Sequence, residues 1–418
     1  MNILWLSHII PYPPKSGVLL RCYNLIKEIS KYHNVTLLSF IQNDQLSEMF
    51  SSIEVGLEES REALSKICTH VEFINIPSEK YIFGKHILAL KSIFTRDPYT
   101  INWLKSKCMY EKIKFINNNY NFDIVHFDTI SLVPYAREFP DITKVLDHHN
   151  IESHMMLRRS TQENNLIKKA YYYQEGKKLL RYEKNHCRDF ELHITCSKLD
   201  KERLDTIITN LNTHVIPNGV DIDYFQPPKH LEEKYNLIFA GSLSWYPNRD
   251  AMIYFSREIW PTLKQVIPDI VMNVVGSSPP QELLQLAKND CRFKVHGFVD
   301  DVREYLSKAS IYICPIRDGG GTKLKLLDAF AMGIPTIAHP VACEGLDVKD
   351  NYNVILADTP NKFISAVQLL INDDKLRNTI SKNARSLVTS NYSFSNIGKT
   401  LSELFYRTHD DYKSRNRN

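Results

Sequence analysis

The sequence predicts an α/β protein made of two doubly wound domains, each with a parallel sheet. Short apolar runs alternate with helical patterns in both halves of the chain, which is typical of helices packed on both faces of a sheet. A turn-rich, proline-punctuated stretch from His214 to Pro228 separates the halves. The length of 418 residues also exceeds what one hydrophobic core usually serves. We therefore expect domains over residues 1–212 and 213–393, then a helix over 394–410 and a polar tail over 411–418.

Apolar runs predict the strands of the first domain: Asn2–Ser7, Val35–Phe40, Val71–Ile76, Asp123–Phe127, Lys144–His148 and Leu192–Ser197. A proline-stiffened loop, Ser7 to Gly17, joins the first strand to a helix. Loops of this kind lie at the carboxyl ends of parallel strands, where open α/β sheets bind their ligands. Gly17 and Arg21 are therefore candidates for contact with an anion. The alternative is a turn glycine and a surface arginine.

The second domain repeats the alternation, with strands predicted over Asn236–Ala240, Val271–Val275, Phe293–His296, Ile311–Ile316, Thr336–His339 and Val354–Ala357. Helices are predicted between them, including Asp250–Val266, Gln281–Ala287 and Val302–Leu306. The last helix is expected to begin at Phe394, after an aromatic break at Tyr392.

A glycine turn follows the strand at Ile311–Ile316 and suits an anion. Gly319, Gly320 and Gly321 let backbone N–H groups approach a ligand closely, and Thr322 is a candidate N-cap of the next helix. Lys323 and Lys325 would then lie in the first helical turn, where the helix dipole disfavours a cation by roughly 0.3–1 kcal/mol. A phosphate group would satisfy both lysines and the free N–H groups. The alternative is a solvated turn in which Lys325 pairs with Asp328.

Polar side chains cluster at the end of one first-domain strand, from Asp147 to His154. Three interpretations stay open: active-site polar groups, core or capping histidines, and a metal site. The spacing matches none of the usual zinc patterns.

Basic residues recur along residues 152–185, which we predict as one long helical stretch interleaved with methionine, leucine and tyrosine. Such a set is a solvated face or a contact with an anionic membrane surface. The formal charge of +4 is too small to predict nucleic-acid binding. Eight scattered cysteines without a C-x-x-C pair suit reduced thiols, and no signal peptide is apparent, so we expect a cytoplasmic protein.

Several motifs give the chain a resemblance to the retaining glycosyltransferases of family 4. They are Pro13–Gly17 with Arg21, Asp147–Asn150, Val215–Asp221, Phe239–Leu243, Val274–Gly276, Val295–Asp301 and Ile311–Pro335. The resemblance spans nearly the whole chain. It implies the GT-B architecture, two Rossmann-like domains that face each other across a cleft, with the acceptor on the first domain, a nucleotide-activated sugar on the second, and a last helix that crosses back.

The resemblance also implies roles for individual residues. Gly297 and Val299 belong to the loop that receives the nucleobase, and Asp328 holds the position that binds the ribose hydroxyls. Gly241, Ser242 and the residues from Gly319 to Thr322 would line the sugar and diphosphate, and Gly17 would close over the diphosphate. His149 aligns with the polar residue near the reacting sugar. The sequence departs from the family at Gly320 and Asp328, where paired glutamates are usual, and at Ser242 and Pro247, where an arginine and a lysine are usual. Lys323 and Lys325 are candidates to replace those cations, as in a subgroup with a Gly-Gly-Gly-Thr-basic-Leu-Lys loop.

We therefore expect a retaining, metal-independent hexosyltransferase without a cofactor. It would move a sugar from a nucleotide diphosphate to a glycan or lipid-linked acceptor in bacterial capsule, O-antigen or exopolysaccharide synthesis, at the inner face of the membrane. His149, Lys323 and Lys325 are the expected catalytic residues, and no metal ligands are expected. Two alternatives stay open, a sugar-nucleotide epimerase on the same fold and a non-catalytic nucleotide-sugar-binding partner.

Overall fold

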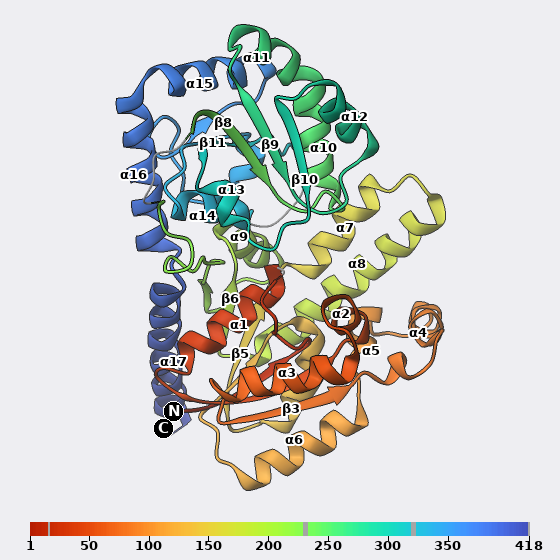
Figure 1. The fold of residues 1–418 in the computed structure, drawn as a ribbon. Helices are drawn as coiled ribbons and strands as arrows, with labels where there is room; N and C mark the ends of the chain where they lie inside the picture. The colour runs from red at the N-terminus through yellow and green to blue at the C-terminus, as the bar shows by residue number, and fades with distance from the viewer. Residues whose placement is uncertain (16, 229–232, 319–322, 417–418) are drawn as a thin grey trace. The chain divides into compact units, whose positions relative to one another are not determined.

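The computed structural model describes residues 1–15, 17–228, 233–318 and 323–416. The chain forms two compact units. Unit 1 comprises Met1–Pro217 and Ile397–Asn418, and unit 2 comprises Asn218–Asn396. The division lies inside the turn-rich stretch that separates the two halves of the sequence. Figure 1 shows the ribbon, coloured along the chain.

Unit 1 is built on a seven-stranded parallel sheet with the order β3-β2-β1-β4-β5-β6-β7. Its strands are β1 (Asn2–Ser7), β2 (Asn34–Ile41), β3 (His70–Asn75), β4 (Ile124–Phe127), β5 (Thr143–His148), β6 (Leu192–Thr195) and β7 (Thr213–Val215). Alternate residues of β1 enter two different core clusters, with Leu4 in one and Trp5 in the other. Helices therefore cover both faces of the sheet, as the continuous apolar runs predict. The strand β7 was not predicted because three residues carry too little pattern.

The helices of unit 1 are α1 (Gly17–Ile29), α2 (Asn43–Met49), α3 (Ile53–Ser65), α4 (Gly84–Ile93), α5 (Tyr99–Trp103), α6 (Lys107–Asn119), α7 (Glu152–Gln162), α8 (Leu166–His186) and α9 (Lys198–Ile207). Short 3-10 segments lie at Pro77–Lys80, Ile130–Glu138 and Cys187–Asp189.

The single helical stretch predicted over 152–185 is wrong, because the structure has two helices there. Glu163 takes an extended conformation at the end of α7. The side chain of Asn165 then accepts hydrogen bonds at 3.1 Å from the N–H groups of Ile167 and Lys168, which caps α8. An asparagine that satisfies the first free N–H groups of a helix favours a new start over continuation.

Unit 2 is built on a six-stranded parallel sheet with the order β10-β9-β8-β11-β12-β13. Its strands are β8 (Glu233–Ala240), β9 (Val271–Val275), β10 (Phe293–Gly297), β11 (Ala309–Cys314), β12 (Thr336–Ala338) and β13 (Ile355–Leu356). Its helices are α10 (Tyr246–Tyr254), α11 (Trp260–Val266), α12 (Gln281–Asn289), α13 (Arg303–Leu306), α14 (Leu324–Ala331), α15 (Pro360–Asn372) and α16 (Asp374–Asn391), with a further 3-10 turn at Pro340–Cys343.

The helix predicted over Asp250–Val266 differs from the observed one in two ways. It begins earlier, at Tyr246, with Pro247 in its first turn. A π-helical turn, Phe255–Ile259, also separates α10 from α11. Pro261 lies in the first turn of α11 and has no N–H to donate, so the regular hydrogen-bond ladder cannot continue through it.

The last helix, α17 (Phe394–Asn416), begins in unit 2 and belongs to unit 1 from Ile397 onward. Ile397, Leu401 and Phe405 recur every four residues and enter a core cluster of unit 1. The helix extends beyond the predicted 394–410 into the residues interpreted as a polar tail. Tyr412 lies in this extension and contacts unit 1, because its hydroxyl donates to the carbonyl of Pro140 at 3.4 Å.

Candidate functional site

Parallel α/β sheets bind ligands at the carboxyl ends of their strands, where the strand order reverses. In unit 1 the reversal lies between β1 and β4. Ser7 ends β1 and His8 follows it, Asp128 follows β4, and His149 follows β5. The fold therefore gathers residues from distant parts of the sequence at one edge.

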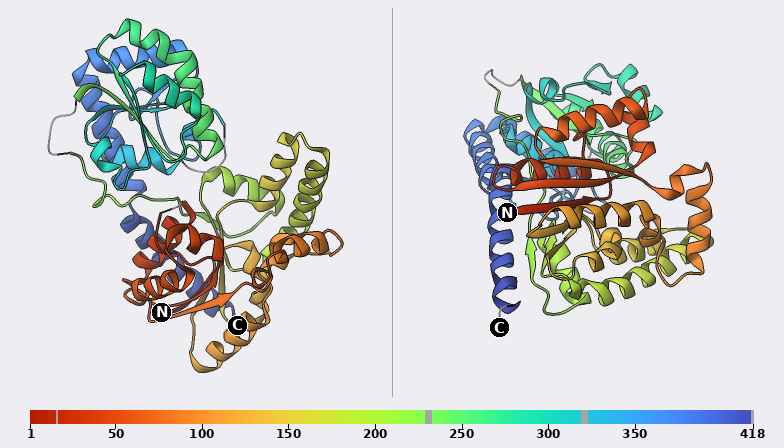
Figure 2. Two further views of the ribbon diagram at one scale, coloured as in Figure 1. Left: turned by 45° about the vertical axis from the view of Figure 1, so that its right-hand side comes forward. Right: turned by 90° about the horizontal axis from the view of Figure 1, so that it is seen from below.

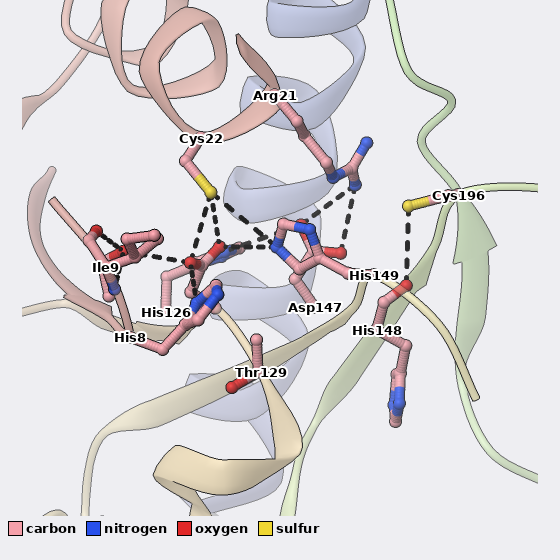
Figure 3. Close-up of polar contacts among 12 residues, drawn as sticks. His8, Ile9, Arg21, Cys22, His126, Thr129, Asp147, His148, His149 and Cys196 are labelled. Atoms are coloured by element: carbon pink, nitrogen blue, oxygen red, sulfur yellow. Dashed lines mark hydrogen bonds and ion pairs between the residues drawn. The ribbon is translucent and has the colours of Figure 1, made fainter. Parts of the chain in front are cut away.

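The side chain of Asp128 lies at the centre of these residues, and it is only 1% exposed. One carboxylate oxygen, Oδ2, lies 3.0 Å from Oγ of Ser7 and 2.9 Å from Nδ1 of His8. The other, Oδ1, lies 2.9 Å from Nε2 of His149. The thiol of Cys22 lies 3.3 Å from both oxygens. We call Ser7, His8, Cys22, Asp128 and His149 the Asp128 cluster. Figure 3 labels His8, Cys22 and His149 among them.

The electrostatics of the Asp128 cluster favour an ion pair. Burial alone would raise the pKa of Asp128, but His149 and His8 outweigh it and hold that pKa well below its ordinary value. Burial alone would lower the pKa of His149, but the Asp128 carboxylate reverses that effect and raises the pKa. The structure thus places His149 beside a buried carboxylate that orients its imidazole and favours the protonated form.

Arg21 lies near the Asp128 cluster but has other partners. Its Nη2 atom donates to both carboxylate oxygens of Asp147, at 3.1 and 3.0 Å, and its Nη1 atom donates to the carbonyls of Ile216 and Pro217 at 2.8 and 3.2 Å. The residue is 1% exposed. This guanidinium ties α1 to β5 and to the end of unit 1, so the donor contact expected of Arg21 stays a prediction. Gly17 is exposed and opens α1.

The histidines of the stretch from Asp147 to His154 separate into different environments. The Nε2 atom of His148 lies 3.0 Å from Nδ1 of His193 inside the core. Burial lowers the pKa of His148 well below its ordinary value and lowers that of His193 to about 4, so both rings are neutral. His148 is thus a core histidine, and His149 belongs to the Asp128 cluster.

Three groups among the described residues bring three metal-ligand atoms within 4.8 Å of one another. They are His148, Cys187 and His193; Cys22, Asp128 and His149; and His126, Asp128 and Asp147. In the second group, burial raises the pKa of the Cys22 thiol well above its ordinary value, with Asp128 adding to the rise. Metals bind the thiolate, so a metal there would first have to displace a proton that the site retains.

In unit 2 the strand order reverses between β8 and β11. Gly241 and Ser242 follow β8, and the backbone of Gly241 approaches its neighbours closely. A Cβ atom on Gly241 would lie 2.7 Å from Nζ of Lys325 and 3.0 Å from Nδ2 of Asn248. A side chain at this position would displace the tip of that lysine, and the φ of +156° also favours glycine. The hydroxyl of Ser242 lies 2.7 Å from those of Ser244 and Ser277.

Lys325 and Asp328 belong to the first turns of α14, whose first residue is Leu324. The Nζ atom of Lys325 donates to the side-chain oxygen of Asn248 and lies 5.1 Å from the ring centre of Phe239. Burial lowers the pKa of Lys325 to about 8 and raises that of Asp328 to about 7. Two groups that titrate near neutrality at a strand edge are typical of a functional site. Lys325 thus has an amide partner rather than the carboxylate of the solvated-turn alternative.

Lys323 occupies the N-cap position of α14 and is buried. The N-cap was expected at Thr322, so the helix begins one residue later than predicted. Thr322 itself, with Gly319, Gly320 and Gly321, lies outside the described residues.

The loop after β10 begins at a glycine and is held at its end by Arg303. Gly297 ends the strand with a φ of +68°, a left-handed conformation that favours glycine. Val299 packs against the core of unit 2, while Phe298 is 74% exposed. Arg303 donates to both oxygens of Asp301 and stacks over Tyr224, which anchors the end of the loop. The nucleobase contact expected of Gly297 and Val299 stays a prediction.

Solved structures share this architecture. Sucrose-phosphate synthase from Thermosynechococcus elongatus has a TM-score of 0.67 at 16% identity, over 97% of this chain and 99% of that one. HepE of Anabaena in complex with UDP has a TM-score of 0.64 at 16% identity, over 97% and 100%. The protein therefore has the two-domain GT-B fold, and the predicted fold class is confirmed.

The sequence comparisons point the same way. Residues 234–373, within unit 2, match the family model described as Glycosyl transferases group 1. An uncharacterized 44.6 kDa protein in the cps region of Klebsiella pneumoniae is 22% identical, over 82% of this chain and 87% of the relative. The Escherichia coli UDP-Gal:alpha-D-GlcNAc-diphosphoundecaprenol alpha-1,3-galactosyltransferase is 25% identical, over 46% of this chain and 52% of the enzyme. Together with the fold, these matches support a glycosyltransferase.

Proposed function

We propose that the protein is a retaining glycosyltransferase that moves a sugar from a nucleotide diphosphate to a glycan or lipid-linked acceptor in bacterial surface polysaccharide synthesis. The group 1 match of residues 234–373 supports the activity. The Klebsiella relative from a cps region and the E. coli galactosyltransferase support the pathway and a diphosphate-lipid acceptor. HepE was solved with UDP-glucose, which supports a uridine nucleotide as the first donor to test.

The observation that carries the proposal is the position of Lys325. Its ammonium lies next to Gly241, where the strand order of unit 2 reverses. The residue itself belongs to the first turn of α14. A diphosphate at this edge would meet that ammonium together with the N-terminal N–H groups of the helix. The pKa of about 8 leaves Lys325 mostly protonated at neutral pH. Lys323, at the N-cap, is the second cation that we assign to the leaving group.

Glycosyl transfer separates charge, because the diphosphate leaves with the bonding electrons and the sugar ring becomes positive. Preorganised donors aimed at the developing negative charge commonly supply roughly 2.7–4 kcal/mol each. Lys323 and Lys325 act on this side of the reaction. Because they neutralise the leaving group, we propose that transfer needs no metal.

In unit 1 we assign the Asp128 cluster to the reacting sugar and the acceptor. His149 is assigned to contact the sugar as a polar group and not as a base. The departing phosphate is then the group that takes the proton of the acceptor. Asp128 is a positioning residue, which holds the ring of His149 through the bond at 2.9 Å.

We further propose a cytoplasmic protein that contacts the inner face of the membrane and binds no nucleic acid. In the part of the chain that the structure describes, none of the helices combines the length and hydropathy of a membrane span. A lipid-linked acceptor would therefore be met at the bilayer surface. The basic helices α7 and α8 support such contact through electrostatic attraction to anionic lipids.

The experiment combines donor binding and transfer. Thermal shifts with a panel of nucleotide sugars identify the donor, and radiolabelled donor with diphosphate-lipid acceptors measures transfer. The double variant Lys323→Ala/Lys325→Ala should abolish transfer while staying folded. The matched control is Lys308→Ala/Lys349→Ala, which removes two exposed lysines of the same unit. Equal turnover in both double variants would end the assignment, and the anomeric configuration of the product decides retention.

One observation favours a second function, a non-catalytic subunit that binds nucleotide sugars. Burial raises the pKa of Asp328 to about 7, so the residue that replaces a family glutamate is partly protonated at neutral pH. Donor binding without turnover across the acceptor panel would support this function. Conversion of donor in the absence of any acceptor would instead indicate an epimerase.

A further inference from the structure

Helix α4 of unit 1 turns an apolar stripe toward solvent. Phe83, Ile87, Leu90 and Phe94 follow one another at intervals of four, three and four residues, so they share one helical face. Their exposed fractions are 68%, 51%, 62% and 85%. Ile82, just before the helix, is 94% exposed. A helix of a globular domain normally buries such a face, so this stripe calls for an apolar partner.

The stripe lies in a segment of the sequence whose charged residues are all basic. No acidic residue occurs from Tyr81 to Arg96, while Lys85, Lys91 and Arg96 are basic. Lys85 is paired with Asp44 and Glu79. Among the described residues, neither Lys91 nor Arg96 has a carboxylate partner within ion-pair distance. Apolar side chains flanked by unneutralised cations suit a lipid bilayer, whose interior is apolar and whose headgroups are anionic.

A basic cleft of unit 1 begins where the stripe ends. Its volume is about 1150 Å³, and seven lysines and arginines but only two aspartates line it. Arg96 lies on it, two residues after Phe94. Lys178 also lines it and donates to the carbonyls of Ser92 and Ile93 at 2.6 and 3.0 Å. These bonds fix the end of α4 to α8, so the cations of the cleft hold a constant place beside the stripe.

A second exposed apolar site lies at the start of α8. Leu166 and Ile167 are 79% and 83% exposed, and Lys168 and Lys169 follow them. Figures 1 and 2 show α4 and the hairpin of α7 and α8 projecting from the same side of unit 1. Leu157 of that hairpin packs on Gly176 and Leu179 is buried, while Met155 and Tyr173 are 40% and 53% exposed. On this side of unit 1, the hairpin therefore supplies cations and an exposed apolar tip, and α4 supplies the larger apolar face.

We infer that α4 is a membrane-docking helix, and that its stripe inserts into the interface of an anionic phospholipid bilayer beside the first turn of α8. This assigns the docking surface to residues outside the stretch 152–185 that the sequence singled out. A second copy of the chain is the competing occupant. The run of cations without acidic residues argues against it, because two identical basic faces would repel each other.

The test is co-sedimentation of the full chain with vesicles, without donor or acceptor, so that its outcome does not depend on the proposed reaction. Vesicles of phosphatidylglycerol and phosphatidylethanolamine are compared with vesicles of phosphatidylcholine alone. Leu90→Glu and Ile87→Glu change exposed positions and should weaken binding to the anionic vesicles by roughly tenfold or more. The matched control is Leu369→Glu, an exposed leucine on a helix of unit 2, which should bind like the wild type.

Three results would overturn the inference. The first is a wild-type chain that does not sediment with anionic vesicles, or binds phosphatidylcholine equally well. The second is equal binding by Leu90→Glu, Leu369→Glu and wild type. The third is a wild-type dimer in light scattering that Leu90→Glu converts to a monomer without any vesicle binding, which would show a second copy on the stripe.

Discussion

The Nε2 atom of His149 lies 2.9 Å from Oδ1 of Asp128, and the two side chains are 9% and 1% exposed. Their attraction outweighs burial for both groups, raising the pKa of His149 and holding that of Asp128 well below its ordinary value. The carboxyl ends of β4 and β5 are thereby joined by a histidine–carboxylate pair, next to the point between β1 and β4 where the strand order of unit 1 reverses. Such a pair makes the free energy of unfolding fall both at acid pH, where the carboxylate is protonated, and at alkaline pH, where the imidazole is neutral.

The first prediction concerns this dependence. Asp128 contributes stability above its ordinary pKa of about 3.9, and the contribution is lost as pH falls through its depressed folded pKa. His149 contributes below about 6.5, and its contribution is lost as pH rises through its raised folded pKa. His149→Gln should therefore lower the free energy of unfolding most between about pH 4 and about pH 6.5, by about 1–3 kcal/mol. Urea unfolding across pH measures the difference.

The matched control is His86→Gln, an exposed histidine of the same unit. It should shift stability little at any pH. A loss in His149→Gln that stays constant from acid to alkaline pH would contradict an ion pair and indicate a packing defect instead.

The fold was predictable, but the composition of the Asp128 cluster was not. Local patterns show where strands end, and His149 was found because several polar residues follow β5 together. Ser7 and Asp128 are 121 residues apart, and only the strand order places β1 beside β4. His8 and Asp128 each follow a predicted strand directly, so the rule for strand ends would have nominated both once that order was known. Cys22 had no such signal, because it lies on a helix.

The same limit applies in unit 2. Lys323 and Lys325 were identified from the sequence alone, because the helix dipole disfavours cations in the first turn of a helix. The partner of Lys325 is Asn248, 77 residues away, and the need for glycine at Gly241 follows from the space that the lysine occupies. Side-chain pairs of this kind depend on tertiary contacts that a linear pattern does not contain.

The second prediction is an optimum of donor affinity between about pH 7 and pH 8, the values to which burial shifts Asp328 and Lys325. Lys325 must be protonated to attract the diphosphate, so affinity should fall as pH rises above its pKa. Asp328 must be ionised to accept from the ribose hydroxyls, so affinity should fall as pH drops below its pKa. Calorimetry with a nucleotide sugar measures the profile.

Two variants test separately the fall of donor affinity at alkaline pH and at acid pH, which we call the alkaline limb and the acid limb. Lys325→Met should weaken binding and remove the alkaline limb, and Asp328→Asn should remove the acid limb. An alkaline limb that persists in Lys325→Met would assign it to another group, such as Lys323.

The third prediction concerns metal removal. Because the cations of α14 neutralise the leaving group in our proposal, dialysis against a chelator should leave the rate of transfer unchanged. The measurement is initial transfer rate before and after dialysis, with added Mg²⁺ and Mn²⁺ in parallel. A rate that collapses on dialysis and returns with either ion would contradict metal independence, and the Asp128 cluster would be the first place to look for ligands.

The fourth prediction concerns Arg21 and Asp147, a buried pair with side chains 2% and 1% exposed. Arg21→Ala would leave the Asp147 carboxylate buried without its main partner, so we expect a loss of about 3–5 kcal/mol in the free energy of unfolding. Arg257→Ala is the matched control, because Arg257 and Glu282 form a bidentate pair that is 62% and 39% exposed, and its loss should lower the free energy of unfolding little. Urea unfolding of both variants gives the comparison. A loss in Arg21→Ala as small as that of the control would mean that the buried pair stabilises unit 1 no more than an exposed pair does. A large loss in Arg21→Ala with donor affinity retained in the folded fraction would show that Arg21 supports the fold and is not needed for donor binding.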